Sequence, residues 1–152
     1  MLTLAIDTAT KVCAVGLCRD GQILAEYRIN MGMTHSEGLM PQLEQLLTRT
    51  KITKNEIDLL AVSMGPGSFT GIRLVLTTAA ALRRVGQARL AGLDNMQALA
   101  TSAVLQHNLF YGTPVWVITH ARRNLELLES LGEKRLQNLH YSFFHSRPVW
   151  RA

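Results

Sequence analysis

The sequence predicts an α/β domain whose mixed sheet begins in three antiparallel strands, with helices packed on the sheet. Three short apolar strand patterns open the chain, at residues 2–6, 12–18 and 22–29. Asp20 and Gly21 separate the second and third patterns, and both residue types tolerate the positive φ angles of a tight hairpin turn. Alternating helix and strand patterns follow, which is the order expected of helices that cover a sheet.

The composition limits the chain to one compact domain, because it has 152 residues with 47% hydrophobic side chains. No run approaches the roughly 18 uncharged apolar residues of a membrane helix. The N-terminus also lacks the basic start and the cleavage site of a signal peptide. Cys13 and Cys18 fall five residues apart in one strand, on opposite faces, so we expect two free thiols in a cytoplasmic protein.

Positive charge is concentrated after residue 50. Residues 1–50 carry 4 Lys or Arg against 5 Asp or Glu, whereas residues 51–110 and residues 111–152 each carry 6 against 3. Such an excess suits an RNA-containing complex. No basic run exceeds two residues, however, so we expect most of these side chains to be solvated surface charges.

The first helix is expected near residues 34–50. Thr34 and Glu37 have the spacing of a capping box, and an apolar stripe follows at Leu39, Leu43, Leu46 and Leu47. Pro41 leaves two alternatives open. It either kinks the first turns of this helix or stands in the first turn of a helix that starts near Leu39.

The middle of the chain alternates between strand and helix. A buried strand is expected at residues 57–64, and a helix then runs from residue 72 to a stop at Gly86. Its inward side is expected to carry Ile72, Val75, Leu76, Ala79 and Leu82. We expect a short strand, a helix and a strand to follow at residues 88–93, 95–107 and 114–119.

The loop between the strand 57–64 and the next helix permits two interpretations. A strand, a glycine-rich loop and a helix together gather backbone N–H groups into an anion site, here with Gly65, Gly67, Ser68, Thr70 and Gly71. The loop lacks the lysine of a P-loop, and its glycine spacing misses the dinucleotide fingerprint. A purely structural turn beside Pro66 is at least as well supported.

Four segments, AIDTAT, THSEGLMPQLEQLL, DLLAVSMGPGSFTGIR and LAGLDNMQALA, carry a resemblance to the TsaB (YeaZ) family over roughly residues 1–123. The resemblance implies an actin/Hsp70-like (ribonuclease H-like) lobe. It also implies a non-catalytic scaffold in the complex that installs threonylcarbamoyl on N6 of adenosine 37, in tRNAs that read codons beginning with A.

The resemblance implies partners as well. They are a catalytic paralogue of the TsaD type, an ATPase of the TsaE type, and tRNA through the complex, with a homodimer when the paralogue is absent. ATP is used by the complex, and no cofactor is expected in this chain. In the family, two helices pack against the equivalent pair of the paralogue, which implies a partner-binding set of Leu39, Leu43, Leu74, Thr77, Ala80 and Ala81.

The small and apolar residues of the helix from residue 72 fit such a set, because small side chains let helices approach closely. A helix that is buried on most sides within its own domain is the alternative.

No catalytic or metal-binding residue is expected. The catalytic paralogue carries a His-x-x-x-His metal pair where this chain has Asn95 and Leu99. Asp7 stands where actin-like ATPases place a carboxylate near the phosphates, but we favour a turn residue that accepts from the backbone N–H groups after it. The alternative functions are an actin-like nucleotide-binding kinase or ATPase, and a glycoprotease-like metallopeptidase.

The resemblance weakens after residue 123. Ala121 and Arg122 fit the family pattern, but His120 stands where the family has aspartate. Residues 124–152 are therefore expected to be an atypical tail in place of the usual second lobe, in a truncated, frame-disrupted or shortened form. One helix, interrupted at Gly132, would place four leucines on one face: Leu125, Leu128, Leu136 and Leu139.

Overall fold

A computed structural model describes residues 1–30, 35–110, 115–121, 125–131 and 142–145 of the chain. The chain divides into two compact units, Met1–Asp94 and Asn95–Ala152. The division therefore falls after Asp94, and the domain boundary expected after residue 123 instead falls inside the second unit.

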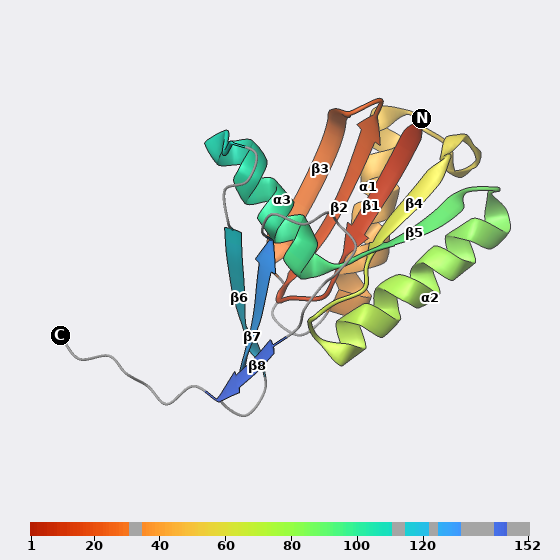
Figure 1. Cartoon of the computed structure of the whole chain (residues 1–152). Helices are drawn as coiled ribbons and strands as arrows, with labels where there is room; N and C mark the ends of the chain where they lie inside the picture. The colour runs from red at the N-terminus through yellow and green to blue at the C-terminus, as the bar shows by residue number, and fades with distance from the viewer. Residues whose placement is uncertain (31–34, 111–114, 122–124, 132–141, 146–152) are drawn as a thin grey trace. The chain divides into compact units, whose positions relative to one another are not determined.

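The first unit is built on the mixed sheet that the sequence predicts (Figure 1). Strand β1 pairs antiparallel with β2, and β2 pairs antiparallel with β3, whereas β4 and β5 continue the sheet in parallel pairing. The turn between β2 and β3 has φ angles of 49° at Asp20 and 85° at Gly21, as the hairpin prediction requires. The strand order is β3(Gln22–Asn30), β2(Val12–Arg19), β1(Leu2–Asp7), β4(Leu59–Ser63) and β5(Arg89–Leu93).

One face of this sheet forms the core. Leu4 of β1 lies opposite Leu17 of β2 and beside Leu60 of β4, and the alternation along the strands sends all three side chains to the same face. Helix α1(His35–Thr50) contacts β2 and β3, and α2(Phe69–Val85) contacts β4, β1 and β5. The apolar stripes of both helices join the same cluster of buried residues, so one core holds the unit together.

The helix bounds differ from the prediction at two places. Helix α1 begins at His35 and contains Pro41, so the alternative start near Leu39 is wrong, while Thr34 lies outside the described residues. Helix α2 begins three residues before the predicted start, because Ser68 is its N-cap and accepts a hydrogen bond from the Gly71 N–H at 3.3 Å. The predicted stop at Gly86 is confirmed.

The connections add one element that the sequence pattern did not predict. A short 3-10 helix, η1(Lys54–Glu56), joins α1 to β4. Cys13 and Cys18 of β2 are both free thiols, as expected. In the described part of the chain, none of the helices combines the length and apolar character needed to cross a membrane.

The second unit combines α3(Asn95–His107), which has the predicted bounds, with an antiparallel three-stranded sheet. Its strands are β6(Val115–Ala121), β7(Leu125–Leu131) and β8(Ser142–His145). The helix expected from Leu125 onward is wrong, because residues 125–131 form a strand that pairs with β6 on one side and β8 on the other. Leu136 and Leu139 lie outside the described residues.

The packing of β1 predicts the effect of a cavity in the core. Leu4 is fully buried at the centre of the sheet, so Leu4→Ala should lower the free energy of unfolding by about 2–5 kcal/mol. Ile23→Ala is the control, because Ile23 is 69% exposed on the edge strand β3 and should cost less than about 1 kcal/mol. Urea unfolding measures both, and equal losses would contradict this core.

Candidate functional site

Two loops meet beyond the carboxyl ends of β1 and β4, and hydrogen bonds fasten them together. The hydroxyl of Thr8 donates to the carbonyl of Gly71 at 2.7 Å, and this bond is buried. The backbone N–H of Ser68 donates to the carbonyl of Ala9, also at 2.7 Å. The loop after β1 is thus joined to the first turn of α2, and we call this contact the loop clamp.

The glycines of the second loop are explained by how closely its backbone approaches the first. A Cβ atom added at Gly71 would lie 1.8 Å from the carbonyl oxygen of Thr8, and one at Gly67 would lie 2.5 Å from that of Ala9. Neither position has room for a side chain. Gly65 has a φ of 100°, a conformation that other residues rarely adopt.

These contacts support the interpretation of the loop as a structural turn. The N–H groups of Ser68 and Gly71 are both used inside the domain, so they are not available to an anion in this arrangement. Thr70 is exposed in the first turn of α2. Anion binding by Gly65, Gly67, Ser68, Thr70 and Gly71 stays a prediction.

Asp7 takes the turn role that the sequence favours. Its Oδ1 atom accepts a hydrogen bond from the N–H of Ala9 at 2.8 Å, which stabilises the loop that enters the clamp. The carboxylate therefore helps to position Ala9, whose carbonyl accepts from Ser68.

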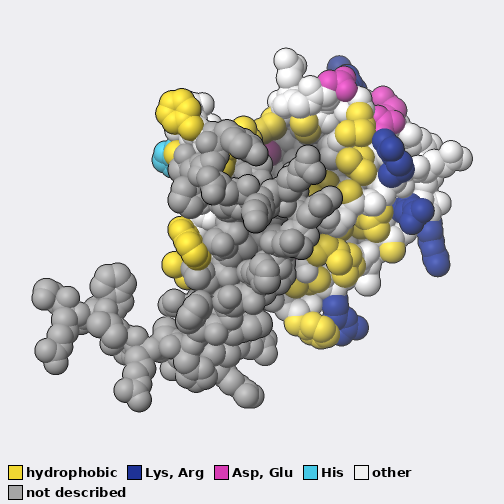
Figure 2. All heavy atoms as spheres, viewed as in Figure 1, with side chains coloured by type: hydrophobic (Ala, Val, Ile, Leu, Met, Phe, Trp, Pro, Cys, Tyr) yellow, Lys and Arg dark blue, Asp and Glu magenta, His cyan; other side chains and the backbone are white. Residues whose placement is uncertain are grey.

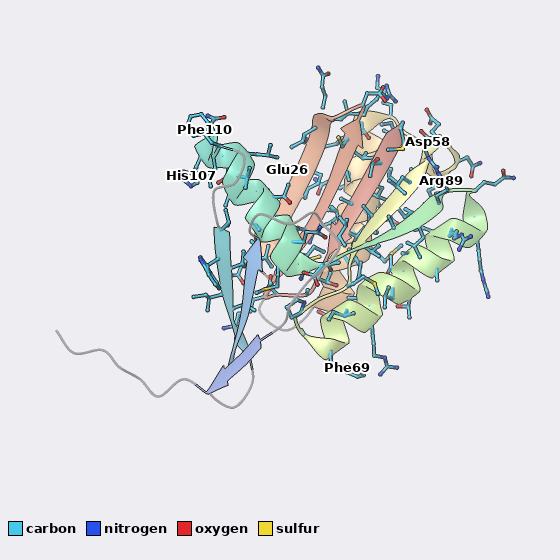
Figure 3. The ribbon with its side chains drawn as sticks, viewed as in Figure 1. Glu26, Asp58, Phe69, Arg89, His107 and Phe110 are labelled. Carbon is cyan, nitrogen blue, oxygen red and sulfur yellow. The ribbon has the colours of Figure 1, made fainter. Side chains whose placement is uncertain are left out.

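Helix α2 turns a broad apolar and small-residue surface away from its own domain. Its buried side consists of Gly71, Val75, Ala79 and Leu82. On the other side, Phe69 at the first turn is 67% exposed (Figure 3), and Val85 at the last turn is 65% exposed. We call the apolar and small exposed residues of this side, with Thr77, the α2 outer face, namely Phe69, Thr77, Ala80, Ala81 and Val85; the exposed Arg73 and Arg84 stand among them.

The hydroxyl of the α2 outer face is satisfied within the helix, and an arginine stands beside its aromatic ring. The Thr77 hydroxyl donates to the carbonyls of Arg73 and Leu74, at 3.0 and 2.9 Å. The guanidinium of Arg73 lies 5.4 Å from the centre of the Phe69 ring, a cation–π arrangement. The face can therefore be covered by a partner without leaving a Thr77 hydroxyl unpaired.

The structure divides the predicted partner-binding residues into two groups. Thr77, Ala80 and Ala81 are exposed and Leu74 is half-buried, so α2 is not buried on most of its sides. Leu39 and Leu43 are only 1% and 2% exposed, so the expectation that they contact a partner is wrong. Their stripe is the apolar face of α1, and the sheet of the same domain covers it.

The positions matched to the metal pair of the paralogue lie in the first turns of α3. Leu99 is 56% exposed and offers no ligand atom, and Asn95 begins the helix. Among the described residues, His, Cys, Asp and Glu form no group of three that could hold a metal ion. His120 belongs to β6.

Sequence reasoning missed Phe69 and Val85 as surface residues. Because the helix was expected to start at residue 72, Phe69 was assigned to the loop. Serine is a preferred N-cap, so Ser68 was the signal that could have placed Phe69 at the first position of the helix. The exposure of Val85 could be inferred only after the structure showed which side of α2 is buried.

The comparisons with known proteins agree with this fold. The family model described as TsaD, tRNA N6-adenosine threonylcarbamoyltransferase, matches residues 22–138. The chain is 33% identical over 103 residues to the tRNA threonylcarbamoyladenosine biosynthesis protein TsaB of Escherichia coli, which covers 68% of this chain and 44% of that protein. It is 28% identical over 148 residues to the TsaB of Haemophilus influenzae, covering 96% and 60% respectively.

Among solved structures, YeaZ from Pseudomonas aeruginosa has a TM-score of 0.78 at 22% identity, and the match covers 99% of this chain and 71% of that one. The fold is therefore the actin/Hsp70-like (ribonuclease H-like) lobe that the sequence predicts. The chain belongs to the TsaB (YeaZ) family.

The similarity also continues beyond residue 123. The family model reaches residue 138, and the Haemophilus relative matches nearly the whole chain, so the expected limit of the resemblance was too short. The chain spans about half the length of the curated relatives it matches.

The loop clamp gives a direct test by mutation. Gly71→Ala should lower the free energy of unfolding by at least about 2 kcal/mol, because its methyl group overlaps the carbonyl of Thr8. The control is Gly16→Ala, whose new methyl group would lie 3.8 Å from its nearest neighbours and should change stability by less than about 1 kcal/mol. Chemical denaturation compares them. A Gly71→Ala protein as stable as the parent would show that the two loops are not in close contact.

Proposed function

We propose that this chain is a non-catalytic scaffold subunit in the biosynthesis of threonylcarbamoyladenosine in tRNA, and that it pairs with a catalytic paralogue of the TsaD type. Membership of the TsaB (YeaZ) family supports the process, since the curated relatives are named as proteins of this biosynthesis. The complex that it joins would modify N6 of adenosine 37 in tRNAs that read codons beginning with A.

The single observation that carries the pairing is the α2 outer face. It combines two large exposed apolar side chains, Phe69 and Val85, with the exposed small residues Ala80 and Ala81. Small residues at the centre allow the backbone of a partner helix to come close, while the large ones bury apolar area at the ends. Helix α1 contacts α2, and its exposed Met40 adds apolar surface outside the core.

The remaining parts of the proposal follow from the family. A second copy of this chain would use the same face when the paralogue is absent, and a TsaE-type ATPase would join the assembled pair. ATP would be consumed by the complex, tRNA would bind through it, and the protein would act in the cytoplasm.

The proposed absence of catalysis rests on the chemistry of the matching positions. Leu99 supplies no metal ligand where the paralogue has histidine. Asp7, the carboxylate nearest to the loop clamp in sequence, is hydrogen-bonded to the N–H of Ala9. The chain would therefore contribute surface and orientation to the reaction, and the paralogue would contribute the reacting groups.

Ala80→Arg tests the pairing. The substitution places a long charged side chain at the centre of the α2 outer face, where burial without a partner charge is costly. Affinity for the paralogue should fall at least about 100-fold, whereas the exposed position should leave folding intact. Pull-down and titration calorimetry with the purified paralogue measure the loss.

The matched control is Ala98→Arg, which adds the same charge at an exposed alanine of α3. It should bind the paralogue like the parent chain. Unchanged affinity in the Ala80→Arg protein would place the interface elsewhere. Circular dichroism of both variants separates a lost contact from a lost fold.

The assignment as a scaffold has its own test. In a modification assay with tRNA, threonine, bicarbonate and ATP, the chain alone should form no threonylcarbamoyladenosine, because its matching positions lack metal ligands. Addition of the paralogue and the ATPase should restore the product, and mass spectrometry of the digested tRNA detects it. Product formed by the purified chain alone would refute the scaffold role.

A further inference from the structure

A cluster of basic residues lies where both helices of the first unit end. Helices α1 and α2 end near the amino ends of strands β4 and β5, because each helix connects to the start of the next parallel strand (Figure 1). Six exposed side chains gather there from both helix ends, from η1 and from β5. We call them the basic end, namely Arg49, Lys51, Lys54, Arg83, Arg84 and Arg89.

Packing brings these segments together although they are distant in sequence. A Cβ atom added at Gly86 would lie 3.1 Å from the carbonyl oxygen of Lys54, which places the end of α2 against η1. The backbone N–H of Arg89 donates to the carbonyl of Asp58 at 2.9 Å. Figure 3 shows Asp58 and Arg89 at this edge, and Phe69 at the opposite end of α2.

Two open grooves cross the basic end. The first lies between the end of α1 and η1, and its lining includes Lys51 and Lys54 together with Glu44 and the apolar Leu47 and Ile52. The second runs from η1 to the start of β5, and its polar lining is Asn55, Asp58, Gln87 and Arg89. Figure 2 shows Lys and Arg side chains along this side of the molecule. The grooves also contain apolar side chains and two carboxylates, Glu44 in the first and Asp58 in the second, and the exposed Lys and Arg side chains stand around them.

Charge within the first unit is concentrated at this end. Residues 44–58 and 83–89 together hold 6 Lys or Arg and 3 Asp or Glu, a net charge of +3. The adjoining hairpin adds Arg19 and Asp20, which offset each other. The rest of residues 1–94 holds 3 Lys or Arg and 4 Asp or Glu, a net charge of −1.

Three nearby carboxylates are engaged by other donors, whereas Glu44 lines the first groove beside Lys51. Glu56 accepts from the N–H and the hydroxyl of Thr53, both at 2.7 Å, and these bonds hold the pKa of its carboxyl below the usual value. Asp58 accepts from the N–H of Leu2 at 2.6 Å, and Asp20 pairs with the N-terminal ammonium group. Among the described residues, none of the six cations forms an ion pair.

Helix electrostatics explain only half of the cluster. Arg49, Arg83 and Arg84 stand in the last turns of α1 and α2, where positive charge stabilises the negative end of the helix dipole. Lys51, Lys54 and Arg89 lie outside both helices. The helix dipoles therefore do not explain why these three cations lie at the same end of the sheet.

We propose that the basic end binds the phosphate backbone of RNA. Exposed lysine and arginine side chains spread over several elements fit a polyanion whose charges repeat along its length. The choice of RNA among polyanions rests on the proposed function in tRNA modification. Arg84 stands four residues after Ala80 on α2, so an RNA bound here lies beside the proposed contact with the catalytic paralogue.

The test uses the full chain and a fluorescent, unmodified tRNA transcript. Lys51→Gln combined with Lys54→Gln removes two cations without touching a described hydrogen bond. Fluorescence anisotropy at about 0.1 M salt should show roughly tenfold weaker binding, and the slope of log affinity against log salt should fall by about 1 to 2. The control combines Lys11→Gln with Arg28→Gln, two exposed cations outside the basic end, and should bind almost like the parent.

Three results would overturn the proposal. They are no binding of tRNA by the parent chain, equal losses in the two double variants, and competition by polyglutamate that matches tRNA at equal charge. The last would indicate an acidic protein as the partner of this surface.

Paralogue pull-downs with the same proteins keep the two proposals separate. The lysine double variant should still bind the paralogue, and Ala80→Arg should still bind tRNA. A parent chain that binds tRNA through Lys51 and Lys54 but never binds the paralogue would refute the proposed function and leave the RNA surface standing.

Discussion

The arrangement of the first unit depends on the close approach of two loops beyond the carboxyl ends of β1 and β4. The backbone at Gly67 and Gly71 touches the carbonyls of Ala9 and Thr8, and the hydroxyl of Thr8 fixes this contact from the other side. Because the contact holds the first turn of α2, it sets the line along which the helix crosses the sheet. The surface of α2 that faces away from the sheet then follows from 3.6 residues per turn.

The single core decides which residues remain for binding. Both helices place their apolar stripes on one face of the sheet. Leu39 and Leu43 of α1 are therefore buried in the core and are not exposed for a partner. Helix α2 has apolar and small residues beyond its buried side, and these form the α2 outer face. In a monomer these residues leave apolar area exposed to water, and a partner would bury that area.

The two proposed surfaces depend on different interactions, and they adjoin on α2. The α2 outer face offers shape and apolar area, so its contact depends on close packing and resists salt. The basic end offers charge, so its contact with RNA would weaken as salt rises. Their adjacency at Ala80 and Arg84 would bring the substrate RNA next to the catalytic partner.

The sequence by itself determined the order of the elements and the class of the fold. Asp20-Gly21 defined the hairpin, the bounds of α3 were read correctly, and the glycine loop was placed between β4 and α2, because these signals act over a few residues. The motifs of the TsaB (YeaZ) family identified the lobe. Asp7 was also assigned to its turn correctly, since its partner is only two residues away.

Only the tertiary structure decided which of these residues are inside, outside or together. An apolar stripe in a sequence does not indicate whether its own domain or a partner covers it. Leu39 and Leu43 were therefore assigned to a partner contact, and the structure shows that their own sheet covers them. Residues 125–131 became a strand because β6 and β8 satisfy its backbone, a choice that leucine spacing cannot make. Lys54 and Arg84 lie thirty residues apart in the chain. Only the packing of α2 on η1 brings their charges to one surface, because contacts between distant segments have no local signature in the sequence.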